Sequence, residues 1–273
     1  MLRSELLKIT TTTAPKIALG VGAGGLILTQ LMSVSVLPAL ASGRMGAVPA
    51  ELRDAIPSLD LVTSSGQLAA LSPLGASGGS GSLGIAVIAI VLMGVLAGTS
   101  DYRFGGIVSS FLAQPNRVRV LLAKAGATGV AGLVTGALFA VVSTATLLGT
   151  LWFLGIPVAI DPIVIAAVLS RSLLAIACLT IVGLAVGILA RSQLAGVLIM
   201  LGVLLLELVV QSITQLIVGG MPVWAQLLPL ALTNTVIGTG ESELPLPAAV
   251  AALLGLTVVA LALAATALRR RDV

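Results

Sequence analysis

The chain has 273 residues, of which 58% are hydrophobic and 9% are charged, and its mean hydropathy is +1.19. A soluble domain carries about 25% charged residues and needs polar side chains to cover its exterior. The composition therefore excludes a soluble globular fold and predicts a chain that is surrounded by lipid. The sequence has no histidine and a single cysteine, Cys178, which excludes His-based acid–base chemistry, His-containing metal sites and an intrachain disulfide.

Six apolar runs are long enough to cross a bilayer, which takes about 17–25 residues per helix. They are continuously apolar and do not alternate as the strands of a membrane barrel do. The sequence therefore predicts an all-α, polytopic membrane protein with a single transmembrane domain, 1–273. The expected spans are 17–41, 82–99, 125–154, 162–189, 194–218 and 246–268. Ala39-Leu40-Ala41 resembles a signal-cleavage site, but the length of the first run and the five later runs favour an uncleaved helix.

The distribution of basic residues predicts the orientation, because cytoplasmic loops carry an excess of Lys and Arg. With the N-terminus inside, only Arg44 and Arg53 are external, and Arg171 lies within a span. Both termini are therefore expected in the cytoplasm. The other 11 of the 14 basic residues are then cytoplasmic: Arg3, Lys8, Lys16, Arg103, Arg117, Arg119, Lys124, Arg191, Arg269, Arg270 and Arg271.

Two of the segments expected outside stand out. The loop 42–81 contains the mixed-charge stretch Glu51-Leu52-Arg53-Asp54, which predicts a short surface helix, and it ends in a Gly/Ser tract typical of a flexible tether. The segment 219–247 is apolar but is interrupted by glycines and prolines, so it predicts two short re-entrant helices rather than a seventh span. Trp224 is expected at the membrane interface.

The cytoplasmic segment 101–124 shows apolar side chains at helical spacing, followed by Pro115. Asp101 or Ser100 is expected to cap the start of this helix. Two interpretations are open, a helix in the headgroup layer with its arginines on anionic lipid, or a helix that docks into a soluble partner. The apolar face consists of Phe104, Ile107, Val108, Phe111 and Leu112.

This segment resembles a known family. Residues 101–107, Asp-Tyr-Arg-Phe-Gly-Gly-Ile, and the Pro-Asn-Arg and Lys within 115–124 are similar to the acidic-Tyr-Arg-x-Gly-Thr-Ile, Pro-x-Arg and Lys pattern of type-2 ABC exporter permeases. Residues 3–8, Arg-Ser-Glu-Leu-Leu-Lys, resemble the Ser-Glu-x-x-Lys entry of that family. The turn 190–193 and the terminal Arg269-Arg270-Arg271-Asp272 are also similar. Asp101 stands where glutamate is commoner, and Gly106 where threonine is usual.

The resemblance implies a bacterial plasma-membrane permease in which 101–115 is a coupling helix seated on an ABC ATPase subunit. The coupling residues would be Asp101, Tyr102, Arg103, Phe104, Ile107, Val108, Phe111 and Leu112, with Arg191 in a second contact. Residues 1–15 would form a connecting helix along the inner membrane face. Two permease chains, identical or different, would pair with two ATPase copies and enclose an export path that 219–247 closes outside.

The resemblance also implies that this chain is not itself an enzyme. No lysine follows a glycine, so the Gly-x-x-x-x-Gly-Lys-Ser/Thr phosphate loop is absent. ATP and Mg would be bound by the partner ATPase, and we expect no cofactor, metal or nucleic acid on this chain. The Ala-, Leu-, Val- and Thr-rich composition suggests a partly apolar substrate, whose identity the sequence does not give.

Three polar residues are expected at membrane depth: Arg171, Glu207 and Gln211. Counted along the helices from Arg191, Arg171 lies about 30 Å and Glu207 about 24 Å away, which leads to the hypothesis of an interhelical ion pair in the outer half of the bilayer. The alternative is that Arg171 extends to the external surface. An ATP-independent carrier or channel is the alternative function. An intramembrane protease is disfavoured because Glu207 has no second acid at its depth.

Overall fold

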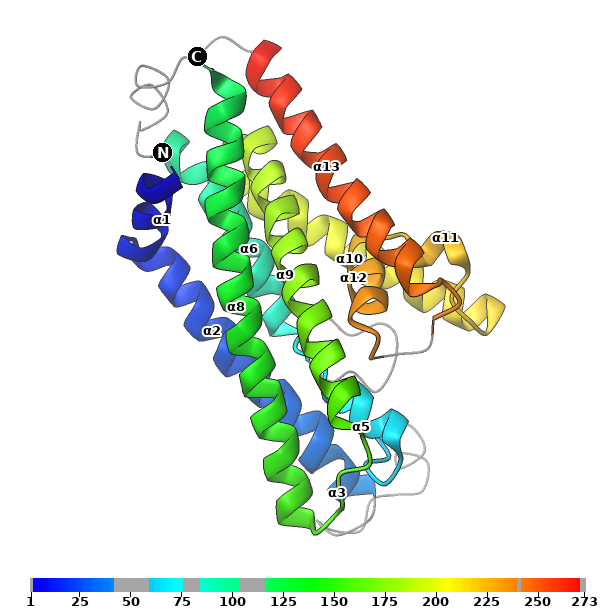
Figure 1. Ribbon diagram of the computed structural model, residues 1–273. Helices are drawn as coiled ribbons and strands as arrows, with labels where there is room; N and C mark the ends of the chain where they lie inside the picture. The colour runs from blue at the N-terminus through cyan, green and yellow to red at the C-terminus, as the bar shows by residue number, and fades with distance from the viewer. Residues whose placement is uncertain (1, 42–58, 76–83, 104–115, 240–241, 271–273) are drawn as a thin grey trace.

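The protein is all-α throughout the described residues of its computed structural model, which are 2–41, 59–75, 84–103, 116–239 and 242–270 (Figure 1). Six helices are long and apolar enough to cross a membrane, which confirms the expected polytopic helical fold. The helices are α1 Leu2–Thr11, α2 Thr13–Leu31, the π-helical turn η1 Met32–Val36, α3 Leu37–Ala41, α5 Ser64–Ala70, α6 Ile85–Arg103, α8 Arg117–Leu154, α9 Pro162–Ala190, α10 Gln193–Val218, α11 Val223–Gln226, α12 Pro229–Ile237 and α13 Leu246–Arg270.

The spans follow the predicted apolar runs closely, and the largest difference is at α8. This helix begins at Arg117 rather than at 125, because Asn116 caps it by accepting a hydrogen bond from the Arg119 N–H at 3.2 Å. Its 38 residues extend over about 57 Å, nearly twice the hydrocarbon thickness of about 30 Å. One end of α8 therefore extends beyond the membrane core. The basic residues that interrupt the apolar pattern here are part of the helix.

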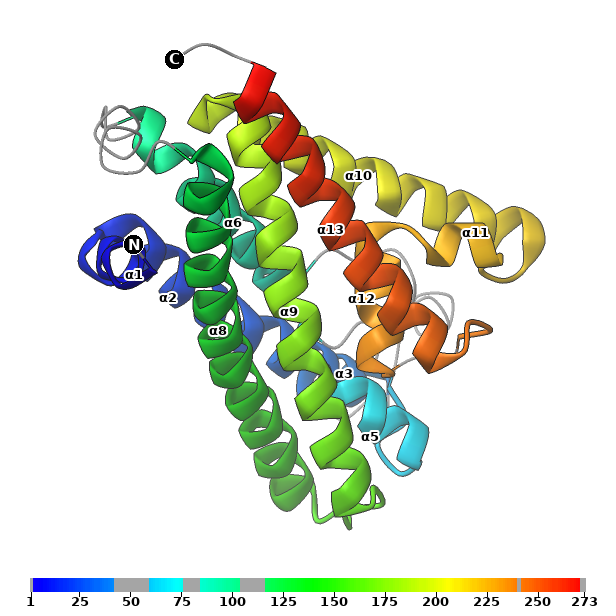
Figure 2. The same ribbon diagram turned by 45° about the horizontal axis from the view of Figure 1, so that its top comes forward.

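The helices form a bundle in which α1 and the end of α13 lie at one end and α5 lies at the other (Figure 1). α6 packs on α9, and α9 also packs on α8, α10 and α13. α9 is therefore the central helix of the bundle. Viewed from the direction of Figure 2, α10 diverges from α13, and α12 lies beside the lower part of α13. Cys178 of α9 is 4% exposed and belongs to the main apolar core, as expected for a structural cysteine.

Glycines permit the closest helix crossing, between α6 and α9. A Cβ on Gly94 would collide with the Thr180 carbonyl oxygen, and one on Gly187 would lie 2.6 Å from the Val95 carbonyl oxygen. Gly98 and Gly183 face the partner backbone in the same way. Both helices therefore carry a Gly-x-x-x-Gly pair, the pattern that lets membrane helices approach each other closely. Here the pattern serves packing within one chain.

The segment between the first two spans contains a short helix and buried side chains. Its described part, 59–75, includes α5 and the buried side chains Leu61, Leu71 and Leu74. Gln67 anchors it, with its Nε2 donating to the Leu61 and Pro157 carbonyls at 2.9 Å each. The segment 42–81, expected as an external loop, thus contains a short helix, α5, that was not predicted. The expected helix at 51–54 and most of the Gly/Ser tract lie outside the described residues.

The segment 219–247 holds two short helices, α11 and α12, as the pattern of prolines and glycines predicts. Pro222 and Leu228 directly precede the two helices, and Gly238 ends α12 with a φ of 77°. Trp224 is 58% exposed. The two helices carry the chain from the end of α10 to the start of α13.

The glycine crossing gives a first prediction. Gly187→Val should destabilise the protein by roughly 3 kcal/mol or more, because a side chain there meets the α6 backbone and cannot be accommodated by a rotamer change. Thermal unfolding in detergent, followed by loss of monodisperse protein on size exclusion, measures this. Gly255→Val is the matched control, since nothing lies within 4 Å of a Cβ at Gly255. Equal unfolding midpoints for the two variants would contradict the predicted crossing.

Candidate functional site

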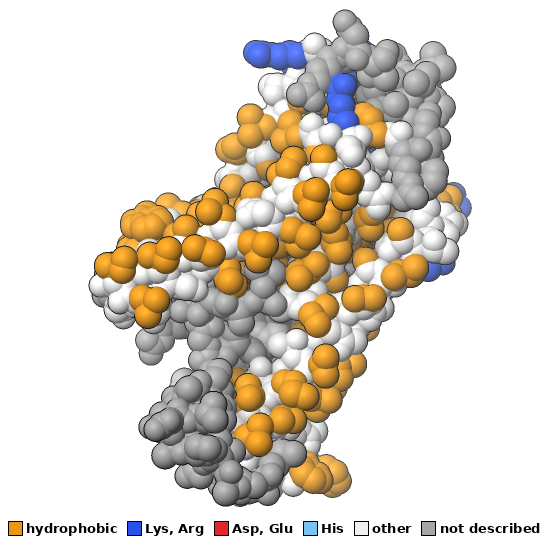
Figure 3. All heavy atoms as spheres, turned by 180° about the vertical axis from the view of Figure 1, so that it is seen from behind, with side chains coloured by type: hydrophobic (Ala, Val, Ile, Leu, Met, Phe, Trp, Pro, Cys, Tyr) orange, Lys and Arg blue, Asp and Glu red, His pale blue; other side chains and the backbone are white. Residues whose placement is uncertain are grey.

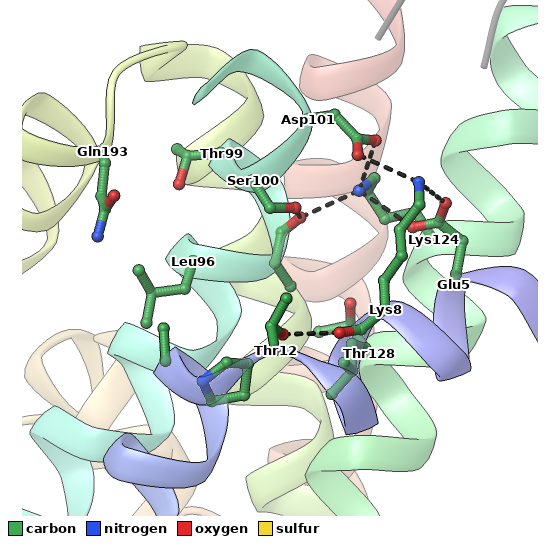
Figure 4. A pocket seen from close by; sticks show the side chains of 14 residues that line it. Glu5, Lys8, Thr12, Leu96, Thr99, Ser100, Asp101, Lys124, Thr128 and Gln193 are labelled. Carbon is green, nitrogen blue, oxygen red and sulfur yellow. Dashed lines mark hydrogen bonds and ion pairs between the residues drawn. The ribbon is translucent and has the colours of Figure 1, made fainter. Parts of the chain in front are cut away.

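Four charged side chains from three helices meet at the end of the bundle where α1 lies (Figure 4). The Lys8 ammonium contacts Glu5 Oε1 at 2.6 Å and Asp101 Oδ1 at 3.1 Å. The Lys124 ammonium contacts Glu5 Oε2 at 3.1 Å and Asp101 Oδ2 at 2.9 Å. Each carboxylate thus binds both ammonium groups, and the ionic cluster closes on itself with no net charge.

Three members of this ionic cluster are withdrawn from solvent. The side chains of Glu5, Asp101 and Lys124 are 11%, 9% and 8% exposed, whereas Lys8 is 43% exposed. Lys124 also donates to the Ala97 carbonyl oxygen at 3.1 Å, so its ammonium binds three acceptor groups within the bundle. Buried ions are tolerated only when their partners compensate the lost hydration. The cluster therefore fixes α1 to α6 and α8 through interactions that fail together if one member is lost.

The position of Asp101 differs from the expectation. α6 continues to Arg103, so Ser100 and Asp101 lie inside a helix and cap none. The Ser100 hydroxyl donates to the Ala97 carbonyl at 3.1 Å, and the Asp101 carboxylate accepts from the two lysines. The predicted cap is wrong because two ammonium groups are stronger partners for this carboxylate than backbone N–H groups.

The remaining predicted coupling residues are only partly visible. Tyr102 is half-buried near the end of α6, and the backbone of Arg103 ends that helix. Phe104, Ile107, Val108, Phe111 and Leu112 lie outside the described residues. The predicted coupling helix over 101–115 is therefore tested only at its first three positions, which continue α6.

A cavity of about 260 Å³ adjoins the ionic cluster (Figure 4). Its walls come from α1, the start of α2, α6, α8 and the first residue of α10, Gln193. The Thr128 hydroxyl lines it without a hydrogen-bond partner among the described residues. The cluster thus borders an internal space that the helices do not fill.

The second predicted contact, the turn around Arg191, lies beside this cavity through its neighbour Gln193. Arg191 ends α9 in the left-handed region with a φ of 57°, and it is the only non-glycine residue with positive φ in the described parts of the chain. Its N–H donates to the Gly187 carbonyl at 3.0 Å, which closes the helix end. The sequence predicts a cytoplasmic turn here, and the structure provides a two-residue connection between α9 and α10.

The hypothesis of an Arg171–Glu207 ion pair is wrong. Glu207, on α10, is 2% exposed, and its oxygens accept from the backbone N–H groups of Leu230 at 2.9 Å and Ala231 at 2.6 Å. Gln211 donates to the same carboxylate at 3.1 Å. Arg171 Nε instead donates to the Ala167 carbonyl at 3.0 Å within its own helix. Glu207 instead satisfies the N–H groups at the N-terminus of α12, which lack acceptors within that helix.

Sequence reasoning missed the ionic cluster, although it named all four residues. Glu5 and Lys8 stand at an i,i+3 spacing, and Asp101 and Lys124 flank the cytoplasmic segment. The chain has only three lysines and ten acidic residues among its 273 residues. That scarcity of charge was the available signal, since isolated ions in a lipid-embedded chain require partners.

The cluster predicts that removing the charge of Lys124 destabilises the protein far more than removing the charge of Lys16. Lys124→Met should cost about 3–5 kcal/mol of stability, because it leaves Glu5 and Asp101 buried with half of their compensation. Lys16→Met is the matched control, since Lys16 is exposed on α2 and forms no ion pair among the described residues. Detergent-solubilised thermal unfolding compares the two, and a similar midpoint for both variants would show that the cluster contributes nothing to stability.

Lys8 predicts a dependence on alkaline pH. Burial lowers the pKa of Lys8, but the hydrogen bond from its ammonium to Glu5 and the charges of Asp101 and Glu5 raise it more, so its pKa lies above the ordinary 10.5. A folded-state pKa above the unfolded one gives stabilisation that is complete below pH 10.5 and is lost as the pH rises through the folded value. The unfolding midpoint of the parent should therefore fall more steeply than that of Lys8→Met above this pH. Parallel profiles would contradict the prediction.

Comparison with known proteins adds no identity to this site. No protein-family model, no curated protein and no solved structure matches the chain. The assignment of function therefore depends on the residues themselves: the ionic cluster, the cavity beside it and the helices that they join.

Proposed function

We propose that this chain is the membrane-spanning permease subunit of an ATP-driven ABC exporter. The observation that carries the proposal is that separate motifs of the family resemblance meet in one ionic cluster. Glu5 and Lys8 belong to the Ser-Glu-x-x-Lys entry, Asp101 to the acidic-Tyr-Arg motif, and Lys124 to the basic end of the cytoplasmic segment. Motif residues that are far apart in the sequence thus contact one another in the fold.

The cluster sits where a coupling segment must transmit force. Asp101 and Lys124 flank the segment 104–115, and their ion pair at 2.9 Å joins the helix that leads into it with the helix that leads out of it. Glu5 and Lys8 attach α1 to the same pair. A displacement of 104–115 by an ATPase subunit would therefore reach α6, α8 and α1 together rather than bend a single helix.

The assembly we propose consists of two permease chains and two ABC ATPase subunits in the plasma membrane of a bacterium. The end of the bundle that holds α1 and the ionic cluster faces the cytoplasm, together with both termini. The ATPase subunits bind ATP and Mg, and this chain supplies the path. The segment that contains α11 and α12 lies at the external side and closes that path.

The proposal predicts a partner that can be isolated. Purification of the tagged chain in mild detergent should retain a soluble ATPase in near-stoichiometric amount, with ATP hydrolysis in the eluate. Phe104→Glu combined with Phe111→Glu should reduce both by about tenfold or more, because charges on the apolar face oppose its seating in a protein groove.

Val62→Glu is the matched control, since Val62 is 72% exposed and lies in the segment next to α5, far from the cluster end. This variant should keep both the partner and the hydrolysis. A parent chain that purifies alone and hydrolyses no ATP in its eluate would overturn the proposal and favour an ATP-independent carrier or channel.

A further inference from the structure

The two charged residues at membrane depth lie at the opposite ends of one short helix, α12. Glu207 binds the backbone N–H groups of Leu230 and Ala231 in the first turn of that helix. Arg171 lies against Gly238, the residue that ends it. A helix carries partial positive charge at its N-terminus and partial negative charge at its C-terminus. The carboxylate and the guanidinium therefore each occupy the end that attracts their charge.

The N-terminus of α12 depends on Glu207 because its own sequence provides no cap. Leu228 stands at the N-cap and has no side-chain acceptor, and Pro229 opens the helix. The free N–H groups of Leu230 and Ala231 would be unsatisfied in an apolar environment without an external acceptor. Glu207 accepts both, one on each oxygen, and Gln211 donates to the oxygen that serves Ala231. A side chain of α10 thus caps α12.

The C-terminus is fitted closely to Arg171. Gly238 has a φ of 77°, and its N–H donates to the Asn234 carbonyl at 2.9 Å. A Cβ on Gly238 would lie 2.9 Å from Arg171 Nη1, so the guanidinium lies directly against this glycine. The Arg171 Nε–H, bound to the Ala167 carbonyl, keeps the side chain along α9 and in this position.

Packing explains why the cap matters for more than α12 alone. α12 packs on α9 and α13 through buried side chains that include Leu232 and Val236, whereas α10 packs mainly on α9 and α6. In Figure 2, α10 diverges from α13, whereas α12 stays beside the lower part of α13. The diverging part of α10 exposes apolar side chains, and the arm that α10 and α11 form in Figure 3 is largely apolar. The hydrogen bonds of Glu207 are thus the main link from the middle of α10 to α12.

We propose that Glu207 and Arg171 are positioning residues that clamp α12 at its two ends and thereby hold α10 against the α9–α12–α13 group. Only the role of the clamp in closing the path rests on the proposed function, since α12 belongs to the segment that would close it. Its existence does not require an ATPase. When the Glu207 bonds break, the start of α12 loses its cap and separates from α10.

Cysteine labelling tests the clamp directly. In a Cys178→Ala background, Thr233→Cys places one thiol on a fully buried position of α12, where the native hydroxyl bonds only its own helix. The rate of alkylation by N-ethylmaleimide in membranes reports how often α12 opens. Glu207→Gln should raise this rate about tenfold or more, as expected when a buried hydrogen bond to a charged group is lost. Thr214 is buried on α10, the helix that carries Glu207, and its hydroxyl donates only to carbonyls of α10. Thr214→Val should therefore leave the labelling rate unchanged.

A charge exchange separates the clamp from an ion pair. If Glu207 and Arg171 acted as a pair, Glu207→Arg combined with Arg171→Glu would restore the parent labelling rate. The clamp predicts the reverse, since each end of α12 would then face a charge of its own sign, and labelling should exceed that of either single variant. Restoration in the double variant, or a parent-like rate in Glu207→Gln, would overturn the proposal.

Variants of Arg171 keep the test decisive if changes at Glu207 prevent folding. Arg171→Lys retains a cation at the end of α12 and should label at the parent rate, whereas Arg171→Met should label faster at a Val236→Cys reporter. Equal rates for these two variants would also overturn the proposal. The labelling is measured in membranes without nucleotide, so a negative result does not depend on whether an ATPase partner exists.

Discussion

The fold depends on how the chain satisfies a few charges in an apolar surrounding. The ionic cluster of Glu5, Lys8, Asp101 and Lys124 shows the solution at one end of the bundle, where two carboxylates and two ammonium groups neutralise one another. Because unpaired ions are so costly away from water, the cluster restricts the positions of three helices at once. The attachment of α1, the end of α6 and the first turns of α8 all follow from it.

Helix packing provides the complementary constraint. In lipid there is little hydrophobic force between helices, so close backbone approach must replace it. The crossing of α6 and α9 does this with glycines, and Gly132 and Gly136 of α8 similarly face Ala177 and Leu173 of α9. The small residues thus make α9 the centre of the bundle, and the charges then orient the outer helices. α6 and α8 take part in both kinds of interaction, whereas the hydrogen bonds of Glu207 link α10 to α12.

The sequence was sufficient for the helices because span length and apolar continuity are local properties. It was also sufficient for the two short helices after α10, since prolines and glycines specify where a helix cannot continue. It was insufficient for partners across the bundle. Glu207 and Arg171 were correctly recognised as residues that need partners at membrane depth, but the partner of Glu207 is a helix terminus, which has no sequence signature at a distance. The packing of 59–75 could not be predicted for the same reason. Gln67 and Ser143 donate to backbone carbonyl oxygens, which any residue could provide.

The two polar arrangements differ in a way that bears on motion. The ionic cluster joins side chains to side chains and lies beside a cavity. The Glu207 site joins a side chain to the backbone N–H groups at the start of a helix within the core. A transport path that opens and closes needs one site that receives the conformational change and one site that controls access. In the proposed exporter these would be the ionic cluster and the clamp on α12, connected through α9, which packs against α6, α8, α10 and α12.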